Sequence, residues 1–286
     1  MKFQIRKKRL SRSAGGDIFI FLVLAAMAAF TALPLVFNIS QAFKPMDELF
    51  HFPPRFFVRN PTLANFYDLF ILMGQSWIPI TRYLYNSVVI VVFSLLGNLL
   101  FASMAAFALS KYSFKGKRFY NEIIILSLMF AQAVIRIPRY LTISYLGWIN
   151  SYWAIILPSW GQTLGLYLIK QFIDSMVDDS LLEAAKIDGA NDFRIYWNIV
   201  MPIVKPAWLT LMILEFQRLW RFTGGEYIYT EKLKTLPFAL SQIIRGGIAR
   251  YGVAAAVTLI MMVIPIVIFL VNQSKIIETM GTSGLD

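Results

Sequence analysis

The sequence predicts an all-α membrane protein that crosses the bilayer six times and carries a two-helix elbow on its cytoplasmic side. Three observations predict this class. Of the 286 residues, 58% are hydrophobic and only 15% are charged, a surplus of apolar residues that a soluble core of this size does not need. The apolar residues form runs of about 20 residues, the length that spans a bilayer. The basic residues gather in a few segments between these runs and at the N-terminus.

Six apolar segments are long enough to be membrane spans. Polar residues or proline interrupt the third, fourth and fifth, so hydropathy alone does not fix their ends. The first follows a basic arm, residues 1–17, as a secretory signal would, but its apolar run is too long for a signal core and a retained helix is expected. The six segments are 18–40, 86–110, 121–145, 152–173, 206–224 and 252–271.

The basic residues predict the orientation, because Lys and Arg accumulate in cytoplasmic loops. Both termini and the segment 174–205 are therefore expected in the cytoplasm, and the net charge of +11 needs no nucleic-acid partner to explain it. The long outer loop, 41–85, is rich in proline and aromatic residues and is expected to form a small ordered cap, so that residues 1–286 make one transmembrane domain. The basic residues in question are Lys2, Arg6, Lys7, Lys8, Arg9 and Arg12 in the arm, and Lys111, Lys115, Lys117 and Arg118 after the second segment.

Several kinds of chemistry are excluded. The chain has no cysteine and a single histidine, His51, in a proline-flanked loop, so we expect no disulfide, no thiol nucleophile and no metal site. It also lacks the G-x-x-x-x-G-K-[ST] phosphate loop, so this chain is not itself an ATPase and holds no cofactor of that kind.

The segment 181–206, LLEAAKIDGANDFRIYWNIVMPIVKP, places charged residues between two apolar blocks. Ser180 and Glu183 have the spacing of a capping box, which predicts the start of a short helix. Asp188 and Gly189 predict a turn, in which Gly189 is free to take positive φ.

A second short helix should follow this turn. Asn191 or Asp192 can cap it, and Pro202 and Pro206 should end it as the fifth span begins. The turn is smooth, because its neighbours are the small residues Ala184, Ala185 and Ala190. This elbow suits docking into a groove of another protein, although an ordinary amphipathic loop helix would explain the same pattern.

The stretch EAAKIDGANDFRIYWNIVMPIVKP closely resembles the EAA motif of bacterial ABC importer permeases, in the carbohydrate-uptake group related to the maltose system. Met201 stands where leucine is usual, a change that conserves volume. The likeness extends to LANFYDLF, ITRYLYNSVVIV, LGWINSYWAIILP and KTLPFALSQI, and so covers most of the chain. The matching motif residues are Glu183, Ala184, Ala185, Asp188, Gly189, Ala190, Ile199, Pro202 and Pro206.

The resemblance implies a permease subunit of the bacterial inner membrane without catalytic residues of its own. Its partners would be a second homologous permease, two ATPase subunits that bind ATP and Mg, and an extracytoplasmic solute-binding protein. The elbow would rest in a cleft of an ATPase subunit and couple hydrolysis to the inward-to-outward switch. Glu183 and Gly189 would be the principal docking residues.

Four arginines depart from the pattern of neutral-sugar permeases. Arg136 and Arg139 lie in the third segment, and Arg218 and Arg221 lie near the end of the fifth. Each pair is spaced i, i+3 and should share one helix face. Counted at 1.5 Å per residue from the cytoplasmic helix ends, Arg136 would lie about 24 Å and Arg218 about 18 Å into the membrane.

Four arginines facing lipid would cost on the order of 10 kcal/mol on insertion scales, so they should face a wet cavity or one another. One interpretation is an acidic substrate held by guanidinium forks, such as a uronate oligomer of the alginate or pectin kind. The alternative is a neutral oligosaccharide, with the arginines at the outer interface or paired with Glu215 and Glu226. Tyr140, Gln217 and Trp220 are candidate sugar contacts, or else aromatic and polar residues of the bilayer interface.

A stand-alone secondary transporter or channel is the rival class. It would need an ion-coupling carboxylate inside the membrane, for which Glu215 is the strongest candidate. The elbow between 174 and 205 would then have no explanation.

Overall fold

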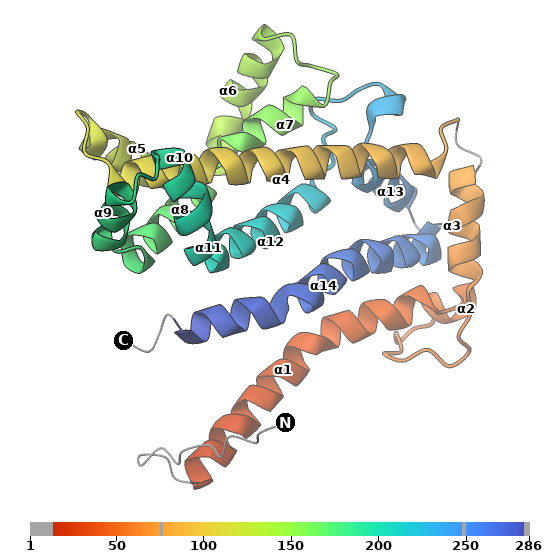
Figure 1. The fold of residues 1–286 in the computed structure, drawn as a ribbon. Helices are drawn as coiled ribbons and strands as arrows, with labels where there is room; N and C mark the ends of the chain where they lie inside the picture. The colour runs from red at the N-terminus through yellow and green to blue at the C-terminus, as the bar shows by residue number, and fades with distance from the viewer. Residues whose placement is uncertain (1–13, 75–76, 248–249, 283–286) are drawn as a thin grey trace. The chain divides into compact units, whose positions relative to one another are not determined.

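The computed structural model describes residues 14–74, 77–247 and 250–282 (Figure 1). Every regular element within these ranges is helical and none is a strand, which confirms the all-α prediction for the described residues. They form two compact units. The smaller unit comprises the described parts of Met1–Leu69 and Ile248–Leu259, and the larger unit those of Phe70–Gly247 and Ile260–Asp286.

The smaller unit joins a long apolar helix to an ordered loop. Its elements are α1 (Ala14–Ala42), α2 (Met46–Leu49), the part of α3 (Ala64–Gly74) up to Leu69, and the start of α14 (Tyr251–Thr282). Polar groups order the loop: the Glu48 carboxylate accepts the backbone N–H groups of Arg59 at 3.0 Å and Asn60 at 2.8 Å. The side-chain amide of Asn65 donates to the Ala42 carbonyl at 3.0 Å. These hydrogen bonds hold the segment that follows α1 in place.

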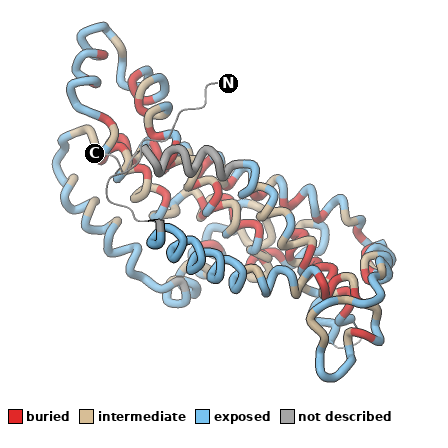
Figure 2. Tube along the Cα trace, turned by 90° about the horizontal axis from the view of Figure 1, so that it is seen from below, coloured by how far each residue is buried: buried red, intermediate tan, exposed pale blue. Residues whose placement is uncertain are grey.

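The larger unit is built around α4 (Ile80–Lys111), a helix of 32 residues against which α7, α8 and α12 pack. Buried positions concentrate where helices pack together, while other helices are exposed along most of their length (Figure 2). The remaining elements are α5 (Lys117–Met129), α6 (Gln132–Tyr145), α7 (Trp153–Trp160), α8 (Thr163–Met176), α9 (Asp179–Ile187), α10 (Asp192–Ile195), the π-helix η1 (Tyr196–Val200), α11 (Met201–Ile203), α12 (Lys205–Arg221), the 3-10 helix η2 (Glu231–Leu233), α13 (Leu236–Ile244) and the rest of α14.

Buried polar side chains on α4 tie other segments to it. The Asn86 amide donates to the carbonyls of Lys232 at 2.9 Å and Lys234 at 2.8 Å, which holds the loop before α13. The Asn98 amide donates to the Ser159 carbonyl at 2.9 Å, where α7 gives way to α8. Backbone groups freed at such breaks have no water to bond within a bilayer and need protein partners. α4 thus fixes the broken helices around it.

Among the described residues, three helices are long and apolar enough to cross a membrane: Gly15–Ala42, Ile80–Lys111 and Tyr251–Val271. Two bent pairs qualify if each is one span, namely Lys117–Met129 with Ala133–Tyr145 and Asp192–Ile203 with Lys205–Arg221.

The predicted third and fourth segments are not single helices. The segment 121–145 divides into α5 and α6, which meet at 111° because Phe130 and Ala131 adopt extended backbone. The segment 152–173 divides into α7 and α8 on either side of Gly161 and Gln162.

Candidate functional site

The elbow predicted within 174–205 is present as two helical arms joined by a tight turn. Its first arm, α9, begins after Asp178, whose backbone is extended (φ −72°, ψ 141°) and whose side chain makes no cap. The predicted capping box of Ser180 and Glu183 is wrong, because Ser180 already lies inside the first turn of the helix. Asp179 occupies that turn, where a carboxylate is favoured by the helix dipole.

Gly189 closes the first arm with a Schellman motif. The Gly189 N–H donates to the Lys186 carbonyl at 3.0 Å and the Ala190 N–H to the Ala185 carbonyl at 3.0 Å. This pattern needs a left-handed residue, and Gly189 has φ 81°, which confirms the predicted positive φ. No described atom lies within 4 Å of the position that a Cβ would take. Glycine is therefore required here by backbone conformation and not by lack of space within this chain.

Asn191 starts the second arm. Its side-chain oxygen accepts the Arg194 N–H at 2.8 Å, so the predicted cap is confirmed at Asn191. α10, η1 and α11 then run on without a break, and a 77° bend leads into α12. Pro202 does not end this arm as predicted: it lies inside α11, and the π-helical turn directly before it accommodates the missing N–H. The arm ends at Val204, just before Pro206.

The elbow has a buried side and an exposed side. Leu182 and Ala185 are buried in the core that α9 shares with α4, α8 and α12. Ala190 is half-buried and packs against the same core. The other motif residues of the turn are exposed, namely Glu183, Ala184, Asp188 and Gly189.

Four large apolar side chains on the elbow are also exposed, and the two most exposed are Ile187 at 86% and Phe193 at 66%; the other two are Leu181 and Trp197. Neither Ile187 nor Phe193 was predicted from the sequence to be exposed. The signal was available, because an apolar residue directly before Asp188 and another directly after Asp192 stand where a solvated loop would have polar groups. An exposed apolar pair beside a smooth turn is typical of a protein-binding surface.

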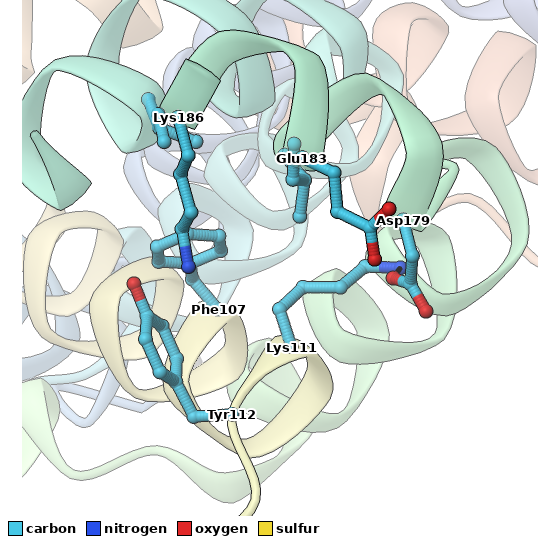
Figure 3. Close-up of a pocket in the computed structure, with 8 residues that line it drawn as sticks. Phe107, Lys111, Tyr112, Asp179, Glu183 and Lys186 are labelled. Carbon is cyan, nitrogen blue, oxygen red and sulfur yellow. Dashed lines mark hydrogen bonds and ion pairs between the residues drawn. The ribbon is translucent and has the colours of Figure 1, made fainter. Parts of the chain in front are cut away.

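A cavity of about 200 Å³ lies between the end of α4 and the elbow (Figure 3). On one side, the Lys111 ammonium bonds the Asp179 carboxylate at 2.7 Å and also donates to the Val177 carbonyl. On the other, the Lys186 ammonium lies 5.5 Å from the centre of the Tyr112 ring. Glu183 also lines this cavity, close to Asp179 in Figure 3.

Burial, together with a hydrogen bond to Asp192, raises the pKa of the Tyr112 phenol to about 12. Tyr112 directly follows α4, whereas Asp192 begins the second arm. The end of α4 is thus bonded to the first arm through Lys111, and Tyr112 lies beside Asp192 of the second arm.

The four arginines do not form one cluster. Arg139 on α6 and Arg218 on α12 line a shared cavity of about 30 Å³ with Ser159, Gln162 and Tyr227. Ser159, Gln162 and Tyr227 were not predicted, and no local motif marks them: the first two lie at the break between α7 and α8, and Tyr227 lies in the loop that follows α12. Arg136 and Arg221 do not line this cavity, and both are exposed.

Two of the arginines are ion-paired, as the alternative interpretation expected. The Arg218 guanidinium bonds both oxygens of Glu215, with Nε to Oε2 at 2.8 Å. Arg136 Nη2 lies 2.8 Å from Glu226 Oε1. Within the described part of the chain, Arg139 and Arg221 have no carboxylate at salt-bridge distance.

The depth expected for Arg136 was wrong, because the count assumed one straight helix through the 111° bend between α5 and α6. α12 is continuous from Lys205, so the distance of about 18 Å from Pro206 to Arg218 holds along that helix.

The three candidate sugar contacts have different settings. The Tyr140 ring stacks on Tyr227 at 6.2 Å between centroids. Trp220 is 4% exposed, and its indole N–H donates to the Met261 carbonyl at 3.3 Å, so it packs inside the unit and does not line the arginine cavity. Gln217 is half-buried on α12 and also lies off this cavity.

The chain is similar to a known protein family and to several known transport proteins. Residues 98–278 match the family model described as binding-protein-dependent transport system inner membrane component. The galactooligosaccharides transport system permease protein GanQ of Bacillus subtilis is 29% identical over 93% of this chain and 94% of its own length. The polygalacturonan/rhamnogalacturonan transport system permease protein YtcP of the same species is 29% identical over 71% of this chain and 68% of its own length.

The fold resembles a chain in the crystal structure of a bacterial ABC transporter involved in the import of the acidic polysaccharide alginate. The TM-score is 0.76 at 21% identity, covering 93% of this chain and 99% of that chain. The family's members span the inner membrane several times and are non-catalytic translocation components. The chain belongs to the family of binding-protein-dependent transport system inner membrane components, as a sugar permease of the ABC importers.

Proposed function

We propose that this chain is one of two homologous permeases in an ATP-driven importer of an acidic oligosaccharide, such as a uronate oligomer of the alginate or pectin kind. It crosses the membrane six times with both termini in the cytoplasm. The elbow then lies in the cytoplasm and docks on one of two ATPase subunits, which bind ATP and Mg. An extracytoplasmic binding protein delivers the sugar.

The observation that carries the substrate class is the cavity shared by Arg139 and Arg218. These residues come from α6 and α12, and the fold brings both to the lining of one cavity. Like charges do not gather in a membrane protein without anions to compensate them. Of the two arginines that line this cavity, Arg218 is paired with Glu215, whereas Arg139 has no carboxylate at salt-bridge distance among the described residues. This leaves a surplus of one positive charge, which one sugar carboxylate would balance.

The relatives support the same class. YtcP is named for polygalacturonan, a polymer of uronate units, and the solved transporter imports the acidic polysaccharide alginate. A neutral oligosaccharide is the second candidate, and a specific observation favours it: Arg136 and Arg218 already have carboxylate partners. GanQ, which is named for galactooligosaccharides, also favours it.

The elbow supports the coupling role. Its exposed residues combine a smooth turn at Ala184 and Gly189 with the apolar side chains of Ile187 and Phe193. Its buried residues fix it to α4, α8 and α12. A segment that transmits a displacement from an ATPase to membrane helices must be rigidly attached to those helices. The rival secondary transporter is set aside, because the chain belongs to the ABC permeases and Glu215 is engaged by Arg218.

The test is uptake by the complete transporter with single arginine variants. Arg139→Gln and Arg218→Gln should each lower the uptake of an acidic oligosaccharide about ten- to a hundredfold, the effect of losing one charged hydrogen bond. Uptake of a neutral oligosaccharide of the same length should fall much less. Arg118→Gln is the matched control, since Arg118 is exposed and its ion-pair partner among the described residues is Glu122, four residues along the same helix. Equal losses for both sugars would assign the arginines to structural pairing and would refute the acidic substrate.

A further inference from the structure

Glu215 is a buried carboxylate beside the arginine cavity, 5% exposed on α12. It holds one edge of the Arg218 guanidinium: Nε donates to Oε2 at 2.8 Å and Nη2 donates to Oε1. The same Nη2 also donates to the Ser159 hydroxyl at 3.2 Å. Since a guanidinium has five N–H groups, these bonds use the one on Nε and both on Nη2.

The remaining edge of Arg218 is the one at Nη1. Within the described residues, no hydrogen bond is made by this nitrogen. The Arg218 side chain is nevertheless 40% exposed and lines the cavity that Arg139 also lines. Arg218 is thus held firmly on one edge and offers the other to a ligand.

We propose that Glu215 is a positioning and specificity residue for the acidic oligosaccharide, an inference that rests on the proposed function. It fixes Arg218 so that Nη1 faces the cavity, and it limits the affinity by placing a negative charge behind that arginine. A substrate carboxylate then receives one or two hydrogen bonds from Nη1 in place of a full bidentate fork. Such a site binds an anion selectively but weakly enough to release it, as a translocation path requires.

The negative charge of Glu215 sets the sign of the expected effect. A like charge within about 4–6 Å disfavours an anion by a factor of ten or more. Removing the charge of Glu215 while keeping its shape should therefore strengthen the binding of an acidic sugar. A neutral sugar has no charge for Glu215 to repel, so its affinity should stay the same.

The experiment uses the complete transporter in lipid nanodiscs, with trigalacturonate as the acidic probe and galactotriose as the neutral one. Glu215→Gln should bind trigalacturonate about tenfold more tightly and transport it with a lower kcat, while galactotriose binding stays unchanged. Glu215→Asp, which keeps the charge, should restore the weak binding of the native protein. Unchanged trigalacturonate affinity in Glu215→Gln, or equal changes for both sugars, would overturn the proposal.

A second variant covers the case in which Glu215→Gln fails to assemble. The double variant Glu215→Gln, Arg218→Gln keeps the net charge of the site and replaces the ion pair by two amides of similar size. Its trigalacturonate affinity should fall at least tenfold, because a positioned charged donor is lost. An unchanged affinity would show that positioning has no role. If Arg139→Gln also leaves acidic binding intact, the proposed substrate class fails; if Arg139→Gln weakens it, only the role of Glu215 fails.

Discussion

Replacement of Gly189 tests how the elbow works, and the structure fixes the expected order of variants. Gly189 has φ 81° as the left-handed residue of the motif that ends α9. For a residue with a Cβ, this conformation costs about 1–2 kcal/mol of free energy. The cost is higher for a β-branched residue, because its χ1 angle is also restricted. Asparagine tolerates the conformation best among the others. Since no described atom lies within 4 Å of the Cβ position, steric overlap within the chain adds nothing.

The assay is substrate-stimulated ATP hydrolysis by the complete transporter. Gly189→Val should lose most of the stimulation, because a penalty of about 2 kcal/mol shifts the turn roughly thirtyfold toward other conformations. Gly189→Asn should keep most of it. Gly147 provides the matched control: it ends α6 with the same two hydrogen bonds, has φ 69° and has open space at its Cβ position. Gly147→Val should lower the thermal stability without uncoupling hydrolysis from substrate.

Two results would refute this reasoning in different ways. Full stimulation in Gly189→Val would show that the turn geometry does not matter for coupling. Equal loss in Gly189→Asn and Gly189→Val would show that the partner approaches Gly189 too closely for any side chain, so that space and not backbone conformation sets the requirement.

Two further predictions concern packing and pH. Gly97→Ala should destabilise the larger unit by more than about 2 kcal/mol. The new Cβ would lie 1.9 Å from Trp160 Nε1 and would break the hydrogen bond from that nitrogen to the Phe93 carbonyl. The double variant Gly97→Ala, Trp160→Leu should recover stability, and thermal unfolding of both variants checks this. The raised pKa of Tyr112 means that the folded state favours the neutral phenol, so its contribution to stability is complete below the ordinary pKa of 10.0 and is lost as the pH rises through about 12; the phenolate absorbance should show this late titration, and Tyr112→Phe should remove it.

The sequence predicted those features of the elbow that depend on local backbone chemistry. Gly189 was assigned correctly, and Asn191 was one of the two candidate caps, because positive φ and side-chain capping are properties of single residues. The start of α9 was missed because Asp178, Asp179 and Ser180 are all good helix-start residues, and the sequence does not rank them. The exposure of Ile187 and Phe193 depends on which side of each arm packs against α4, which is a tertiary property.

The membrane segments show the limit of hydropathy. α1, α4 and α14 were found because each is one continuous apolar helix. The break at Phe130 and Ala131 was not predicted, because neither residue is a helix breaker and the apolar run continues through it. The break at Gly161 was missed for a different reason: Asn98 on α4 satisfies the freed Ser159 carbonyl, and that partner lies far away in the sequence. The pairing of Arg218 with Glu215 was foreseen because it is an i, i+3 pair on one helix.

The same geometry joins the two candidate sites. α12 starts at the bend that ends the elbow and runs unbroken to Arg221, so a displacement of the elbow reaches Arg218 through a single stiff helix. Arg139 lies on α6, beyond the 111° bend that separates α6 from α5. Elbow and Arg139 are therefore not joined by one rigid element. If an ATPase moves the elbow, we expect Arg218 to shift relative to Arg139. The binding of a carboxylate held between the two arginines would then change.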